Sequence, residues 1–182
     1  MSVQPTAGLL RRFRRDRRGV ALVEFALIFP MLVALYFGGF EVCNMSATYR
    51  KMTDTTVELA NITAQYSTLT ASDVATVFAA TSQIMAPYST ASLQIVLSEV
   101  TTDASNNATV TWSRGYNGAS ALGAGSAITL PSGLASPSTS YILVQTVYNY
   151  TPTVGSAFLG TVPMSSSIYI IPRNSPSIPY TG

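Results

Sequence analysis

The stretch GVALVEFALIFPMLVALYFGGF, from Gly19 to Phe40, decides how this chain is organised, because it contains a single charged side chain, Glu24. At 1.5 Å of rise per residue, a helix of about twenty residues crosses about 30 Å of hydrocarbon. A buried core helix is seldom this long and apolar on every side. A secretory signal has a shorter apolar region that ends in small residues at a cleavage site. We therefore predict a transmembrane helix over residues 20–40.

The charge of the chain is concentrated just before this stretch. Six of its ten basic residues form one run: Arg11, Arg12, Arg14, Arg15, Arg17 and Arg18. Because moving many guanidinium groups across a membrane is costly, such a run stays in the cytoplasm. We predict a basic cytoplasmic leader over residues 1–19 and a C-terminal domain outside the cytoplasm. The remainder is poor in charge and offers no basic surface for nucleic acid.

Two residues inside the apolar stretch are unusual for a membrane helix. Glu24 lies about 7.5 Å of helix rise beyond Gly19, where its carboxylate either reaches the headgroups, is protonated, or pairs with a partner. Pro30 removes one backbone hydrogen bond, so a bend or local loosening is expected over residues 26–30. Neither residue breaks the predicted span.

The arginine run, Gly19, and the block Val20-Ala21-Leu22-Val23-Glu24-Phe25 together resemble the prepilin-type signal of type IV pilins. The longer run RRGVALVEFALIFPMLVALYFGGFEV is more similar to the TadE-like proteins of tight-adherence (Tad, Flp-type) pilus systems. The features that carry this resemblance are Gly19, Val23-Glu24-Phe25-Ala26, Pro30, the Gly38-Gly39 pair and Glu41.

The resemblance implies a minor pilin or pseudopilin of the bacterial inner membrane that supports assembly of a surface pilus. It implies that a prepilin peptidase cuts after Gly19, that Val20 becomes the new N-terminus, and that Glu24 pairs with its amine. Other pilin or pseudopilin subunits, the inner-membrane assembly platform and membrane lipid are the implied partners. An uncleaved, signal-anchored assembly factor is the alternative, and Glu24 then pairs with a cation of a neighbouring subunit.

The pattern beyond the membrane predicts an α+β fold of pilin-like type, with the long helix packed on a small antiparallel sheet. An amphipathic helical extension is expected over residues 41–68. Its apolar face carries residues three and four apart: Val42, Met45, Tyr49, Met52, Thr56, Leu59, Thr63 and Tyr66. In the extracytoplasmic domain, residues 69–182, a second helix capped by Ser72 and Asp73 ends near Met85. Four strands are expected: Leu93 to Thr102, Thr109 to Gly115, Tyr141 to Tyr150 and Val162 to Ile171.

The connections of this domain differ in their expected exposure. Residues 103–107 suit a hairpin turn, with a calcium loop as the weaker interpretation. Residues 115–140 are rich in Gly, Ala, Ser and Thr and are expected to form an exposed loop, which in an adhesin-like alternative binds a surface. The tail from Pro172 is expected to be extended and peripheral. The aromatic residues are expected to pack rather than to form a binding surface: Trp112, Tyr116, Tyr141, Tyr148 and Tyr150.

No enzymatic function is predicted from the sequence. The chain has no histidine, and Cys43 is its single cysteine. The serines and threonines form no nucleophile-elbow pattern, and Lys51 is the one lysine that a serine could recruit as a base. We therefore predict no catalytic residue, no metal site and no cofactor.

Overall fold

A computed structural model describes residues 18–182, with the side chains of Arg18, Ala157 and Phe158 outside the description. All but the last two residues of the predicted basic leader, residues 1–19, therefore lie outside the described residues. The chain divides into two compact units, with the boundary between Cys43 and Asn44. The fold is α+β, as predicted, with a long N-terminal helix and an antiparallel sheet.

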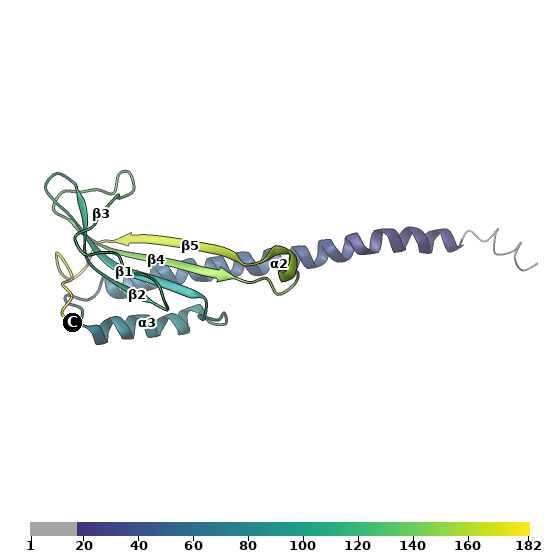
Figure 1. The fold of residues 1–182 in the computed structure, drawn as a ribbon, viewed down its shortest axis with the longest axis horizontal. Helices are drawn as coiled ribbons and strands as arrows, with labels where there is room; N and C mark the ends of the chain where they lie inside the picture. Colours follow the sequence, from purple (N-terminus) through teal and green to yellow (C-terminus); the bar gives the residue numbers. More distant parts are fainter. Residues whose placement is uncertain (1–17) are drawn as a thin grey trace, which may run out of the picture. The chain divides into compact units, whose positions relative to one another are not determined.

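Helix α2 spans Arg18–Thr63 and is continuous through Pro30 (Figure 1). The predicted bend at Pro30 stays a prediction. The helix ends at Thr63, five residues before residue 68, where the expected extension ended. Its second half contains threonines whose hydroxyls each donate to the backbone carbonyl four residues earlier: Thr48, Thr53, Thr55, Thr56 and Thr63. Such bonds let threonine lie buried on a helix without an orphaned hydroxyl.

Helix α3 spans Ala71–Met85, and its cap corrects the sequence analysis. The N-cap is Thr70, one turn before Asp73, and not Ser72 or Asp73 as predicted. The Thr70 hydroxyl accepts from the Asp73 N–H at 3.2 Å, and Asp73 Oδ2 accepts from the Thr70 N–H at 2.9 Å. This capping box satisfies two backbone donors that have no partner inside the helix. The Thr70 hydroxyl also donates to Asp73 Oδ2 at 2.7 Å, and this bond, followed by the one from the Thr70 N–H, holds the pKa of the Asp73 carboxyl below its usual value.

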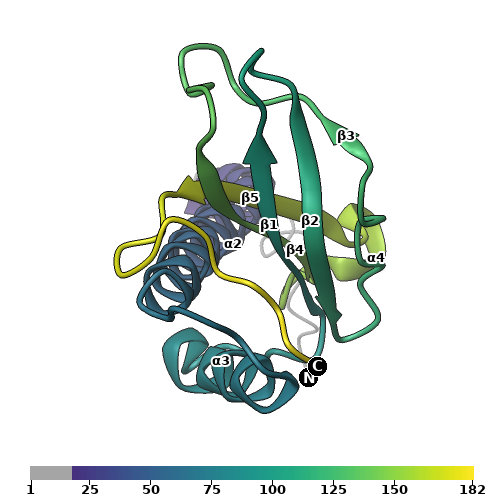
Figure 2. The ribbon, with the colours of Figure 1, turned by 90° about the vertical axis from the view of Figure 1, so that its left-hand side faces the viewer.

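The sheet has five antiparallel strands in the order β3-β2-β1-β4-β5, where four were predicted (Figure 2). The four long strands match the predicted ones to within one residue at each end. The additional strand, β3, has two residues, too few to produce a sequence periodicity. The strands are β1 Leu93–Thr102, β2 Ala108–Tyr116, β3 Ala127–Ile128, β4 Ser140–Tyr150 and β5 Val162–Ile170, and the short helix α4, Ser156–Leu159, precedes β5.

The turn between β1 and β2 is organised by one aspartate. Asp103 Oδ1 accepts from the backbone N–H groups of Ser105 and Asn107 at 2.7 and 2.9 Å, and Oδ2 accepts from the Asn107 side chain at 2.8 Å. Asn106 has a φ of 66°, which asparagine tolerates better than most residues. Residues 103–107 are therefore a hairpin connection, as predicted.

The main core lies between one face of the sheet and two helical segments, α3 and residues 44–63 of α2 (Figure 2). Helix α2 and strand β4 also share a buried polar contact, since the hydroxyls of Thr56 and Thr146 lie 2.7 Å apart. The predicted helical face is buried at Met52, Thr56, Leu59 and Thr63, whereas Tyr49 is exposed. Burial of Trp112, Tyr141, Tyr148 and Tyr150 confirms that these aromatic residues pack.

A second, smaller core covers the other face of the sheet. Its buried members are Val100, Ala108, Val110 and Leu143. Residues 115–140, expected to be an exposed loop, contribute half-buried side chains to it: Leu122, Ile128 and Leu130. The segment is therefore exposed along much of its length but held to the sheet by these apolar side chains and by β3.

The C-terminal tail is wrongly predicted as peripheral. Ile178 is fully buried in the main core. Its N–H donates to Glu99 Oε1 at 2.7 Å, and its carbonyl accepts from Trp112 Nε1 at 2.7 Å. The Tyr180 ring packs against Trp112 and lies under the Arg114 guanidinium, 3.8 Å from the ring centroid. The tail thus closes one end of the core.

Candidate functional site

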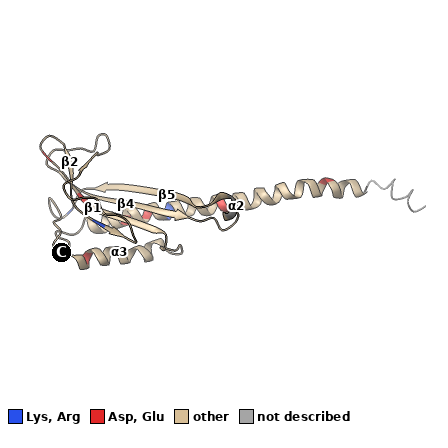
Figure 3. Cartoon of the chain, viewed as in Figure 1, with Lys and Arg blue, Asp and Glu red and all other residues tan. Residues whose placement is uncertain are grey.

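The N-terminal half of α2 presents an apolar surface that the described residues of its own unit, 18–43, leave uncovered. Figure 3 shows this half of the helix almost free of charged residues. Its large side chains are exposed, with Leu35 at 75% and Met31 at 73%. None of the residues in its most apolar window is buried inside the chain. A water-soluble core helix would bury these side chains. By its length and composition, this helix is able to cross a membrane.

The predicted site residues all lie at the start of this helix. Gly19 and Val20 belong to the first turn of α2, which begins at Arg18. Glu24 follows one turn after Val20 and is exposed. Among residues 19–182, Glu24 has no hydrogen bond or ion pair, so its partner has to come from outside these residues or from water. Pro30 lies one and a half turns further along.

The glycines of this half are not explained by contacts within the chain. A Cβ added at Gly19, Gly38 or Gly39 would meet no heavy atom within 4 Å. A glycine inside a helix costs about 1 kcal/mol relative to alanine. In membranes, small residues at such positions let a neighbouring helix approach closely. The open space beside these glycines is therefore suited to contact with another helix.

Comparison with protein families finds a match to the family described as TadE-like protein, over residues 19–61. Over this segment, the chain is similar to TadE-like proteins. The predicted resemblance to TadE-like proteins of tight-adherence pilus systems is confirmed. Comparisons with curated proteins and with solved structures gave no match.

The TadE-like match contains all of the predicted site residues, Gly19, Val20, Glu24 and Pro30, and ends inside α2. It includes the exposed apolar half and most of residues 44–63. The sheet and the C-terminal tail lie outside it. The roles predicted for the four residues stay predictions, and the matched helix suggests membrane anchoring of a pilus-associated protein.

Sequence reasoning missed one buried acid in the second unit. Glu99 on β1 is fully buried, and its Oε1 accepts from Ser140 Oγ at 2.6 Å and from the Ile178 N–H at 2.7 Å. Its Oε2 has no hydrogen-bond partner among the described residues. A lone acid in a strand of β-formers carries no sequence signal that separates a solvated face from a buried one. Glu99 joins three distant segments and is a structural centre of this unit.

The described residues contain no cluster of three or more His, Cys, Asp or Glu side chains suited to a metal ion. Cys43 is exposed and unpaired within residues 18–182. The chemistry offered by residues 19–40 is therefore that of an apolar helix surface with one carboxylate, that of Glu24.

Proposed function

We propose that this TadE-like protein is a membrane-anchored minor pilin or pseudopilin that supports assembly of a tight-adherence surface pilus. The observation that carries the proposal is the apolar half of α2, which exposes a carboxylate and three glycines among uncovered aliphatic side chains. In a bundle of such helices, Glu24 meets an amine of a neighbouring subunit, and the glycines allow close packing. Other pilin subunits and the inner-membrane platform are the proposed partners.

In this proposal the N-terminus is cytoplasmic and the second unit lies outside the inner membrane. A prepilin peptidase cleaves between Gly19 and Val20, and the new amine of Val20 pairs with Glu24. The charge pair lowers the cost of placing either group in an apolar bundle. N-terminal sequencing of the membrane-extracted protein tests the cleavage directly, because processing yields a chain that starts at Val20. A chain that retains its leader supports the uncleaved assembly factor instead.

The Glu24 role is tested by Glu24→Ala in the producing cell. We expect normal membrane insertion, because the substitution makes the span more apolar, together with loss of incorporation into the pilus complex. Val23→Ala is the matched control, since it truncates the neighbouring side chain without removing charge. Incorporation is measured by co-purification with pilin subunits and by counting surface pili. Normal pilus output from Glu24→Ala overturns the proposal.

A further inference from the structure

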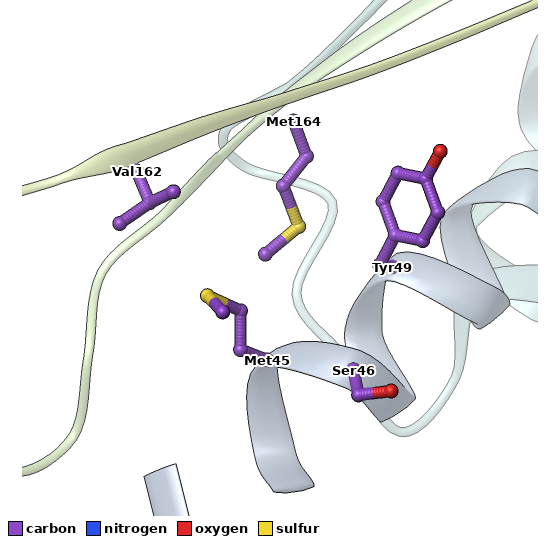
Figure 4. A pocket seen from close by; sticks show the side chains of 5 residues that line it. All are labelled: Met45, Ser46, Tyr49, Val162 and Met164. Carbon is purple, nitrogen blue, oxygen red and sulfur yellow. The ribbon is translucent and has the colours of Figure 1, made fainter. Parts of the chain in front are cut away.

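The second unit contains an apolar pocket of about 290 Å³ between α2 and the beginning of β5 (Figure 4). Met45, Ser46 and Tyr49 line it from α2, and Val162 and Met164 line it from β5. The side chains of Met45 and Met164 point into the same space (Figure 4). Apart from the Ser46 and Tyr49 hydroxyls, its lining is aliphatic, thioether and aromatic. A polar ligand would find few hydrogen-bond partners in it.

The pocket lies close to the predicted membrane along the chain. Met45 follows Phe40, the end of the apolar run, by five residues. Five residues rise about 7.5 Å as a helix and reach about 17 Å when fully extended, so no orientation of the two units places Met45 far from that end. The headgroup layer outside the hydrocarbon is several ångströms thick. The pocket entrance therefore falls within reach of membrane lipid.

The chemistry of the pocket lining suits a lipid chain. Methionine side chains are flexible and adapt to an irregular apolar occupant. Tyr49 is half exposed, which suits an aromatic residue with an apolar body at the lipid and a hydroxyl in the headgroup layer.

A positive charge accompanies the pocket on the same helix. Arg50 lies four residues after Ser46, which places it one turn further along the same face of α2. Its side chain is exposed and forms no ion pair with residues 19–182. Lys51 follows directly. A guanidinium in this position can bind a phosphate with two parallel hydrogen bonds, as arginine does with oxyanions.

We propose that the pocket binds one acyl chain of a membrane phospholipid whose anionic headgroup pairs with Arg50. The inference rests on the membrane span of the proposed function and adds a specific lipid contact to it. This lipid contact would hold the second unit at the membrane surface, independently of the helix contacts made by residues 20–40.

Photo-crosslinking in a bilayer tests the proposal with the full chain. The protein is placed in nanodiscs of equal parts phosphatidylcholine and phosphatidylglycerol, the latter carrying a diazirine in its acyl chain, and labelled residues are mapped by mass spectrometry. We expect labels at Met45, Val162 or Met164 as well as along residues 20–40. Val162→Trp fills the pocket and should lower its labelling about tenfold, the equivalent of losing burial of about two methylene groups. Ile171→Trp, an exposed site just beyond the other end of β5, should leave it unchanged.

The headgroup contact is tested separately. Arg50→Gln should lower pocket labelling by the anionic probe about fivefold, as expected for one cation near a membrane surface, and Arg50→Lys should restore part of it. Lys51→Gln is the control for general surface charge, and an equal loss in both variants overturns the Arg50 assignment. Labels on residues 20–40 without pocket labels overturn the lipid site and leave the membrane anchor standing. Crosslinks between two copies through the pocket assign it to a second subunit, and the absence of label everywhere contradicts both proposals.

Discussion

The two halves of α2 form one continuous helix, but apolar residues are buried in the second half and exposed in the first. Leu59, in the second half, is 1% exposed and packs in the main core, whereas Leu35, in the first half, is 75% exposed. Both are leucines on the same helix, so residue type does not account for the difference. The second half is covered by the sheet of its own unit. The first half has no such cover among the described residues.

The same contrast separates two glutamates. Glu99 is buried and accepts two hydrogen bonds from its own chain, while Glu24 is exposed and has none within residues 19–182. An acid whose partners are internal contributes to folding, and an acid without internal partners in an apolar surface is available to another subunit. The difference is that Glu99 has its partners inside the chain, whereas the proposed partner of Glu24 belongs to another subunit.

The largest difference in stability is expected between truncations of the two leucines. Leu59→Ala leaves a cavity in the main core and should lower the free energy of unfolding of the second unit by about 3 kcal/mol. Leu35→Ala removes an exposed side chain of the first unit and should change the free energy of unfolding of the second unit by less than about 0.5 kcal/mol. Denaturant unfolding of the full chain in mild detergent, followed by near-UV circular dichroism, compares them. Equal effects would show that the two halves are not energetically distinct.

The two glutamates give the next largest effect. Glu99→Ala leaves the Ser140 hydroxyl and the Ile178 N–H without an acceptor, which should cost about 2–4 kcal/mol of stability. Glu99→Gln keeps an oxygen for both donors and should retain most of it. Glu24→Ala should leave the second unit unchanged in the same unfolding measurement. A Glu99→Ala variant as stable as the parent would remove Glu99 from the structural centre assigned to it.

Two glycines are expected to respond in opposite directions. At Gly115 a Cβ would overlap the carbonyl oxygen of Ala119, so Gly115→Ala should destabilise the second unit by about 1–3 kcal/mol. At Gly38 the space is open, so Gly38→Ala should strengthen the isolated helix by about 1 kcal/mol while weakening close contact between subunits. Thermal unfolding by circular dichroism measures the first effect, and co-purification with pilin subunits measures the second. Unchanged co-purification after Gly38→Leu would exclude a close helix contact there.

The first half of α2 could be predicted from the sequence more fully than the α3 cap, β3 and the C-terminal tail of the second unit. An apolar run with a basic flank is a local signal, so residues 20–40 could be identified without knowing the fold. The main strands also follow local β-forming patterns. The sequence also contains the signal of the α3 cap, because Thr70 stands three residues before Asp73, but Ser72 and Asp73 are capping residue types as well and the local pattern does not separate them.

The tail and β3 could not be predicted for a physical reason. Ile178 is buried because Trp112 and Glu99, far away in sequence, offer partners to its backbone. A proline-rich tail carries the same local pattern whether it docks or not. Likewise, the two residues of β3 pair with β2 only because the sheet edge is present. Positions of this kind are set by tertiary contacts and leave no periodicity.

The smallest expected effect is the loss of stability of the second unit at acidic pH. The hydrogen bonds of Thr70 to Asp73 hold the folded-state pKa of this carboxyl below its usual value of 3.8. A carboxyl with a lowered pKa contributes stability that is present above the unfolded value and lost as the pH falls through the folded value. Asp103 follows the same rule through its bonds from Asn107 and Ser105.

Asp73→Asn should therefore flatten the loss of stability of the second unit below about pH 4, where the parent loses the contribution of the ionised cap. The melting temperature of the full chain in detergent, followed by near-UV circular dichroism from neutral pH into this range, measures the slope. Asp54→Asn is the matched control, because Asp54 is exposed on α2 and has no hydrogen bond among the described residues. An acid response that is the same in all three proteins would place its origin outside the α3 cap. If α2 remains helical while the tertiary signal disappears, the acid response belongs to the packed unit and not to the membrane half of the helix.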